Sequence, residues 1–157
     1  MKNTIPGIRT SLLILIGWFL TTGIVWAYEG ETHKNLAGMD IYIGVIPAEV
    51  LQGRDIPMET KMHGGVPLGR NRYHLVVALF DSKTNARISH ARITANIARL
   101  GSGGSTKILG RMKINDVVTF GNYFVLPVNT PYRIRMKLDV PGKEVTEALF
   151  QSNGIVR

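Results

Sequence analysis

The sequence contains no cysteine, so neither disulfide bonds nor thiol chemistry can contribute to the fold or to function. A chain of 157 residues without such cross-links must be held together by the packing of apolar side chains. Acidic residues are also scarce, because 11 Asp and Glu stand against 19 Lys and Arg. The formal net charge of +8 favours anionic partners, such as an acidic protein or an anionic membrane surface.

Signatures of several enzyme classes are missing as well. The Gly-Ser segment at 101–105 lacks the Gly-Lys-Ser/Thr ending of a P-loop, and no helical pattern follows it. The sequence MHGG at 62–65 has the glycines of an esterase oxyanion hole, but the chain contains no Gly-x-Ser-x-Gly motif. Carboxylates are few and scattered along the chain. We therefore predict that the protein is not an enzyme.

Residues 1–27 have the layout of a secretory signal peptide. Lys2 and Arg9 flank a short basic head, and an uncharged apolar run follows at 11–25. This run is shorter than the roughly 20 residues that span a bilayer, which favours cleavage before Tyr28 over retention as an anchor. Either outcome predicts a periplasmic or extracytoplasmic domain, anchored to the inner membrane if the segment stays uncleaved. Nucleic acid is not an expected partner at that location.

The rest of the chain shows the alternation of apolar and polar side chains that is typical of strands. Ile134 and Leu138, for example, alternate with basic residues, and no segment keeps a helical period. Turn-forming residues separate the apolar runs at short intervals. We predict an all-β, immunoglobulin-like antiparallel β-sandwich of about seven strands over 39–151, preceded by a flexible lead at 28–38 and followed by a C-terminal tail at 152–157.

The same alternation identifies the side chains that should form the core. We expect these to be mostly buried: Leu75, Val77, Leu79, Ile93, Ile97, Phe120, Tyr123, Ile134, Met136 and Leu138. Met112 has the phase of Ile108 and Ile114 along its strand, so we expect it in the core too. The polar segment at 81–85 is predicted to form a turn between strands.

Several short stretches resemble small exported sandwich domains of the YtkA-like and CopC-like kind. They are YHLVVALFD at 73–81, the following Thr84, Ile88, Ala91 and Ile93, FGNYF at 120–124, and YRI at 132–134. The similarity covers roughly residues 60–150. This resemblance implies an immunoglobulin-like sandwich with a role in copper handling at the cell envelope.

Methionine and histidine gather in a segment that has no strand pattern. Met58, Met62 and His63 lie close together there, and His74 stands at the start of the next predicted strand. Thioether and imidazole groups suit Cu(I), and an exported protein without thiols would have to use them. We therefore predict that these four side chains form a copper site. The ion would be exchanged between this site and a copper donor or acceptor protein. The alternative is that Met58 and Met62 fill gaps in the core while His63 is an exposed loop residue.

Basic residues offer a different function. They are Arg133, Arg135 and Lys137 on one predicted strand, and Lys107, Arg111 and Lys113 on another. If these two strands share a sheet, all of the cations would line one face. Such a face favours a membrane-tethered structural or interaction subunit that docks an acidic partner, whereas an ordinary solvated sheet face is the other interpretation.

Overall fold

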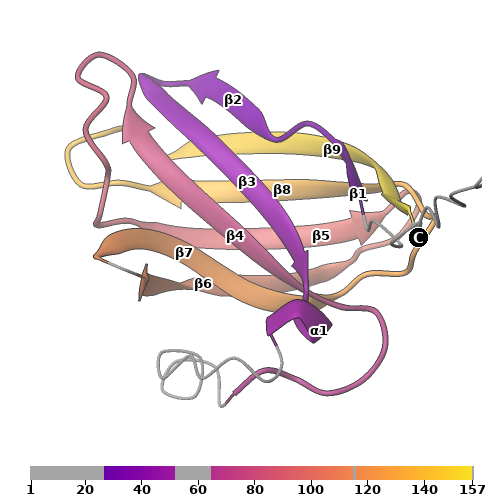
Figure 1. Cartoon of the computed structure of the whole chain (residues 1–157). Helices are drawn as coiled ribbons and strands as arrows, with labels where there is room; N and C mark the ends of the chain where they lie inside the picture. The colour runs from indigo at the N-terminus through magenta and orange to yellow at the C-terminus, as the bar shows by residue number, and fades with distance from the viewer. Residues whose placement is uncertain (1–26, 52–64, 115, 157) are drawn as a thin grey trace, which may run out of the picture.

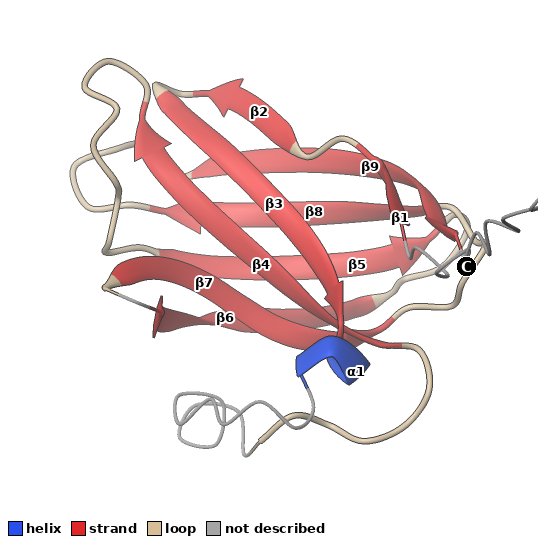
Figure 2. Ribbon diagram, viewed as in Figure 1, coloured by secondary structure: helices blue, strands red, loops and turns tan. Residues whose placement is uncertain are grey.

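In its described residues the protein is an antiparallel β-sandwich with one short helix (Figures 1 and 2). The computed structural model describes residues 27–51, 65–114 and 116–156. The described strands are β1 (Ala27–Gly30), β2 (His33–Leu36), β3 (Met39–Pro47), β4 (Arg72–Asp81), β5 (Arg92–Arg99), β6 (Ser105–Ile114), β7 (Val117–Val125), β8 (Tyr132–Asp139) and β9 (Thr146–Val156). The helix α1 (Ala48–Leu51) follows β3 directly. The predicted fold class is therefore confirmed.

The two layers of the sandwich are connected at both of their edges. The strand order is β1-β9-β8-β5-β6-β7-β4-β3-β2, and every neighbouring pair is antiparallel. The first half of β6 pairs with β5 and its second half pairs with β7, so β6 passes from sheet A (β1, β9, β8, β5) to sheet B (β7, β4, β3, β2). At the other edge the chain crosses between β1 and β2, where the amide of Glu31 donates to the carbonyl of Gln151.

The apolar core lies between the two sheets. All of the positions that alternation predicts to be buried have a relative exposure of 5 % or less. Most of them belong to one continuous hydrophobic cluster, but Tyr123 does not, because it stands on the outer face of sheet B. The alternation thus identifies the buried residues correctly. Around β4 and β7, however, side chains are buried on both faces of sheet B.

The predicted turn at 81–85 is held by the carboxylate of Asp81. Its Oδ1 accepts hydrogen bonds from the backbone amides of Lys83 and Thr84, each at 3.1 Å. Its Oδ2 lies 3.0 Å from Nζ of Lys143, which begins the connection into β9. The hydrogen bond from Lys143, followed by those from Thr84 and Lys83, holds the pKa of Asp81 far below its ordinary value.

Both ends of the domain differ from the prediction. The lead at 28–38 was expected to be flexible, but it contains β1 and β2, and β9 continues through most of the predicted tail at 152–157. The strand number therefore rises from about seven to nine in the described residues. Alternation fails here because β1 and β2 are short edge strands, and an edge strand such as β2 leaves nearly all its side chains exposed.

The predicted signal peptide cannot be compared with the structure, because residues 1–26 lie outside the described part of the chain. Among the described residues, no helix is long and apolar enough to span a membrane.

Candidate functional site

The predicted copper ligands fall into two groups. Met58, Met62 and His63 lie outside the described residues, so their position relative to the fold stays a prediction. His74 is described: it is the third residue of β4, and its side chain is buried, with a relative exposure of 2 %. The candidate site is therefore built around His74.

The strand alternation of β4 places His74 on the outer face of sheet B. Its neighbours Tyr73 and Leu75 both point into the core, so the imidazole points the other way. The register sets His74 beside Ile46 of β3 and Tyr123 of β7. The rings of His74 and Tyr123 stack, with centroids 4.5 Å apart and an angle of 20° between their planes. The helix α1 contacts β4 at the same end of the sheet, as Figure 1 illustrates.

A methionine joins this histidine from another strand. Met112 has a relative exposure of 1 % but is not part of the core cluster. It shares the phase of Ile108, as the alternation predicts, yet that phase is the outer one, because Ile108 is 63 % exposed. The expected burial of Met112 is therefore confirmed, but it is buried against the outer face of sheet B and not in the cluster between the sheets.

Gly121 is the position where the two side chains converge. A β-carbon on Gly121 would lie 2.6 Å from Nε2 of His74 and 2.7 Å from Cε of Met112. It would also lie 2.8 Å from the backbone carbonyl oxygen of Leu75. The absence of a side chain at this position thus leaves a small cradle on the sheet, which an imidazole and a thioether side chain occupy together.

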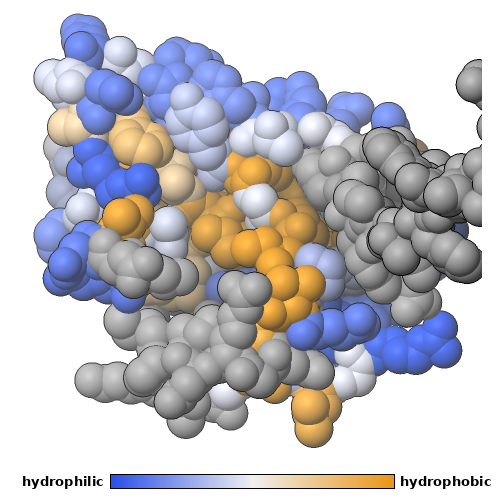
Figure 3. Space-filling view, viewed as in Figure 1, coloured by the Kyte–Doolittle hydropathy of each residue, from blue (hydrophilic) through white to orange (hydrophobic). Residues whose placement is uncertain are grey.

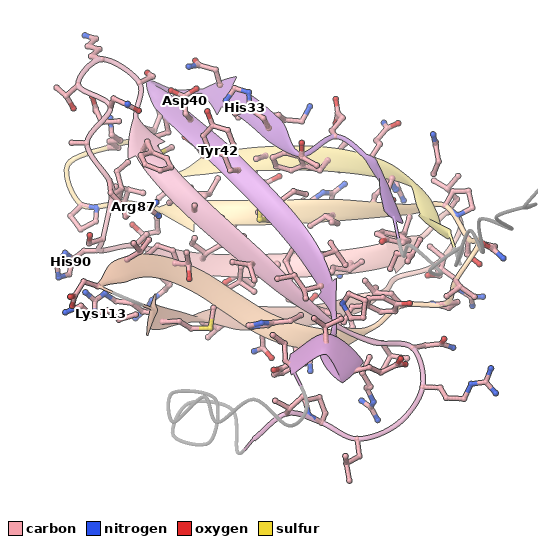
Figure 4. The ribbon with its side chains drawn as sticks, in the orientation of Figure 1. His33, Asp40, Tyr42, Arg87, His90 and Lys113 are labelled. Atoms are coloured by element: carbon pink, nitrogen blue, oxygen red, sulfur yellow. The ribbon has the colours of Figure 1, made fainter. Side chains whose placement is uncertain are left out.

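Other titratable side chains form smaller groups. Within the ranges that the structure describes, no cluster of three or more His, Cys, Asp or Glu could hold a metal ion. One exposed group is the pair of His33 and Asp40 (Figure 4), whose Nε2 and Oδ1 atoms lie 2.9 Å apart. This hydrogen bond, with a second one from Asn35, lowers the pKa of Asp40. His33 also stacks on Tyr42, with ring centroids 4.4 Å apart.

The predicted face of six cations is not formed. Arg133, Arg135 and Lys137 do share the outer face of sheet A, where their partners on β5 include Asn96 and Thr94. The basic residues of β6 have the opposite phase, since Lys107 pairs with Ala95, whose side chain points into the core.

Each basic residue of β6 has a contact of its own away from that face. Nζ of Lys107 donates to the carbonyl of Tyr123 at 2.7 Å, and Nε of Arg111 donates to the carbonyl of Ser89 at 2.8 Å. Lys113 pairs with Asp116. The prediction assumed one phase for both strands, which the sequence of either strand alone cannot establish.

Comparisons with known proteins identify the fold only. No protein-family model and no curated protein matches the sequence. Among solved structures, FetP of uropathogenic Escherichia coli, expressed recombinantly in the periplasm, has a TM-score of 0.61 at 13 % identity, covering 86 % of this chain and 100 % of that one. Copper-reconstituted P19 from Campylobacter jejuni has a TM-score of 0.59 at 14 % identity, covering 85 % and 99 %. A DUF4426 family protein from Pseudomonas aeruginosa has a TM-score of 0.60 at 14 % identity, covering 78 % and 91 %.

Proposed function

We propose that this protein is a non-catalytic periplasmic accessory protein that binds Cu(I) and exchanges it with a donor or acceptor protein. The observation that carries the proposal is the convergence of an imidazole and a thioether side chain at Gly121, since these are the groups that suit Cu(I) in a chain without thiols. Its fold is shared with P19 and FetP, both of which have copper-bound structures, and this supports the same ligand class.

The proposed ligands are His74 together with Met58, Met62 and His63. His74 would be the fixed member of the set, because its ring is buried on the outer face of sheet B and stacked on Tyr123. The other three precede β4 in the sequence. Methionine and histidine ligands are neutral, so the ion can leave by stepwise ligand exchange without separating strongly bound opposite charges. The predicted signal peptide and the periplasmic expression of FetP support a location outside the cytoplasm.

A Cu(I) titration tests this function. The purified protein is titrated under anaerobic, reducing conditions in competition with a chromophoric Cu(I) chelator, and we expect one ion per chain. His63→Ala and His74→Phe should each weaken binding, because each removes one ligand nitrogen. Phenylalanine is chosen at position 74 because it retains the stack on Tyr123. His90→Ala is the matched control, since His90 is exposed and belongs to a pocket with Arg92 and Arg111. Failure of the parent protein to bind Cu(I) would refute the proposal.

A second candidate function is docking of an acidic surface on the outer face of sheet A. Arg133 and Arg135 line one pocket there, whereas Lys137 stands opposite Glu147 on β9. We expect the variant with Arg133→Gln and Arg135→Gln to lose binding to vesicles that contain an anionic phospholipid. Lys83→Gln, on the exposed turn after β4, should bind like the parent. Equal binding by all three proteins, or none by the parent, would exclude the anionic membrane surface as a partner.

A further inference from the structure

We propose that Met112 ligates the same Cu(I) ion as His74, and that Gly121 is the position that lets the two side chains meet. This inference rests on the proposed copper function and deepens it. It assigns a ligand role to a methionine that alternation alone would leave as a packing residue. It also gives the site two ligands on β4 and β6, the two strands that flank β7 in the sheet.

Three strands determine how these residues meet. In sheet B, β7 lies between β4 and β6, and Gly121 stands beside Val76 of β4 and Gly110 of β6. His74 comes two residues before Val76, whereas Met112 comes two residues after Gly110. The two side chains therefore approach Gly121 from opposite directions along β7, and both must lean over it to converge there.

The available space depends on the absence of a side chain at position 121. A β-carbon would lie 2.6 Å from Nε2 of His74 and 2.7 Å from Cε of Met112, both shorter than real contacts of such an atom. Because Nε2 of His74 and Cε of Met112 both lie so near this β-carbon position, the distance between these two atoms is less than twice the longer of the two distances. Rotation about the Cγ–Sδ bond of Met112 moves its methyl group without moving the sulfur. The thioether lone pairs can thus turn toward the imidazole without any change in the backbone.

The chemistry of this pair selects a soft, singly charged ion. Both donors are neutral, so a divalent ion would keep its full charge in a buried position, which is strongly unfavourable. Hard cations prefer oxygen ligands, and structural zinc sites use several His and Cys ligands, while thioethers favour Cu(I). The described part of the chain holds no carboxylate and histidine cluster that would supply such ligands. We therefore expect this site to prefer Cu(I) to Zn²⁺.

Replacing the sulfur without changing the packing tests the proposal. Met112→Leu keeps the side-chain volume but removes the thioether. The matched control is Met136→Leu, because Met136 is fully buried between the two sheets and belongs to the core cluster. In the Cu(I) titration of the full-length protein we expect the Kd of Met112→Leu to rise by about tenfold or more, and that of Met136→Leu to stay at the parent value.

A second measurement does not depend on how well the variants fold. In the parent protein labelled with ¹³C-methyl methionine, Ag(I) serves as a redox-inert analogue of Cu(I), and we expect the Met112 methyl signal to shift while that of Met136 does not. An unshifted Met112 signal, with unchanged Cu(I) affinity in Met112→Leu but weaker binding in His74→Phe, would overturn the role of Met112 and leave the copper function standing. A parent protein that binds no Cu(I) would overturn both.

Discussion

Two adjacent glycines in the β5–β6 connection differ sharply in what surrounds them. Gly104 has a φ of +73°, and a β-carbon there would lie 2.3 Å from the carbonyl oxygen of Ile97 and 2.7 Å from Cα of Ala98. Both atoms belong to the backbone of β5, so neither can move aside like a flexible side chain. Gly103 has no atom within 4 Å of its β-carbon position. Gly104→Ala should therefore be strongly destabilising and Gly103→Ala should not.

The size of the effect follows from two contributions. A left-handed backbone costs a residue with a side chain roughly 1–2 kcal/mol, and forcing an extra methyl group into a packed region costs about 1–3 kcal/mol. Gly104→Ala should thus lower the free energy of unfolding by roughly 2–5 kcal/mol, whereas Gly103→Ala should stay within about 0.5 kcal/mol of the parent.

Urea denaturation followed by far-UV circular dichroism measures both variants. A shift in the midpoint without a change in the m-value assigns the difference to the folded state. The connection must be well ordered for the clash to matter. Nδ2 of Asn96 donates to the carbonyl of Gly103 at 3.1 Å and to Oγ1 of Thr106 at 2.8 Å. These two hydrogen bonds hold the connection against β5. Equal midpoints for the two variants would show that the connection adjusts freely, and the reasoning would then be wrong.

Three further predictions concern acid stability, the core and the N-terminus. Because the pKa of Asp81 is lowered by folding, its ion pair with Lys143 should stabilise the protein above about pH 4, the pKa of an unfolded Asp, and this contribution should disappear as the pH falls further. Asp81→Asn should therefore be less stable than the parent at pH 7, and the difference between their urea midpoints should shrink as the pH falls from about 4 to 2. Ile134→Ala should lower the free energy of unfolding by roughly 2–5 kcal/mol because Ile134 is fully buried, and an unchanged midpoint would contradict its place in the core. Exported protein should begin at Tyr28, and intact-mass spectrometry that finds Met1 would refute cleavage.

Residues in central strands were predictable from the sequence, and residues at the edges were not. Leu75, Val77 and Leu79 alternate with less buried neighbours along β4, so their burial follows from a period of two. β2 carries no such signal, because three of its four side chains are exposed and its stability comes from backbone pairing with β3. The local sequence indicates which side chains are buried, but it does not indicate which strands pair at the edge of a sheet.

The residues of the candidate site were also only partly predictable from the sequence. His74 was identified because its side-chain chemistry is visible in the sequence. Its partner Met112 lies 38 positions further along the chain and meets it only through the register of β7 with both neighbouring strands. That register also brings Gly121 between them. A single sequence contains the donors, while their convergence depends on pairings of strands that are distant in the chain.

The sheet A edge joins the two ends of the domain, because β1 pairs with the C-terminal part of β9. During synthesis, residues 27–30 must therefore wait until residues 152–156 have emerged before that edge can close. The core stays accessible to other chains or to chaperones at this edge over the same interval. Even the folded domain shows apolar residues near the centre of the face seen in Figure 3. Pairing between residues so far apart also raises the contact order, which slows folding relative to proteins with local contacts. Deletion of the last strand should hence leave a chain that cannot complete its sandwich.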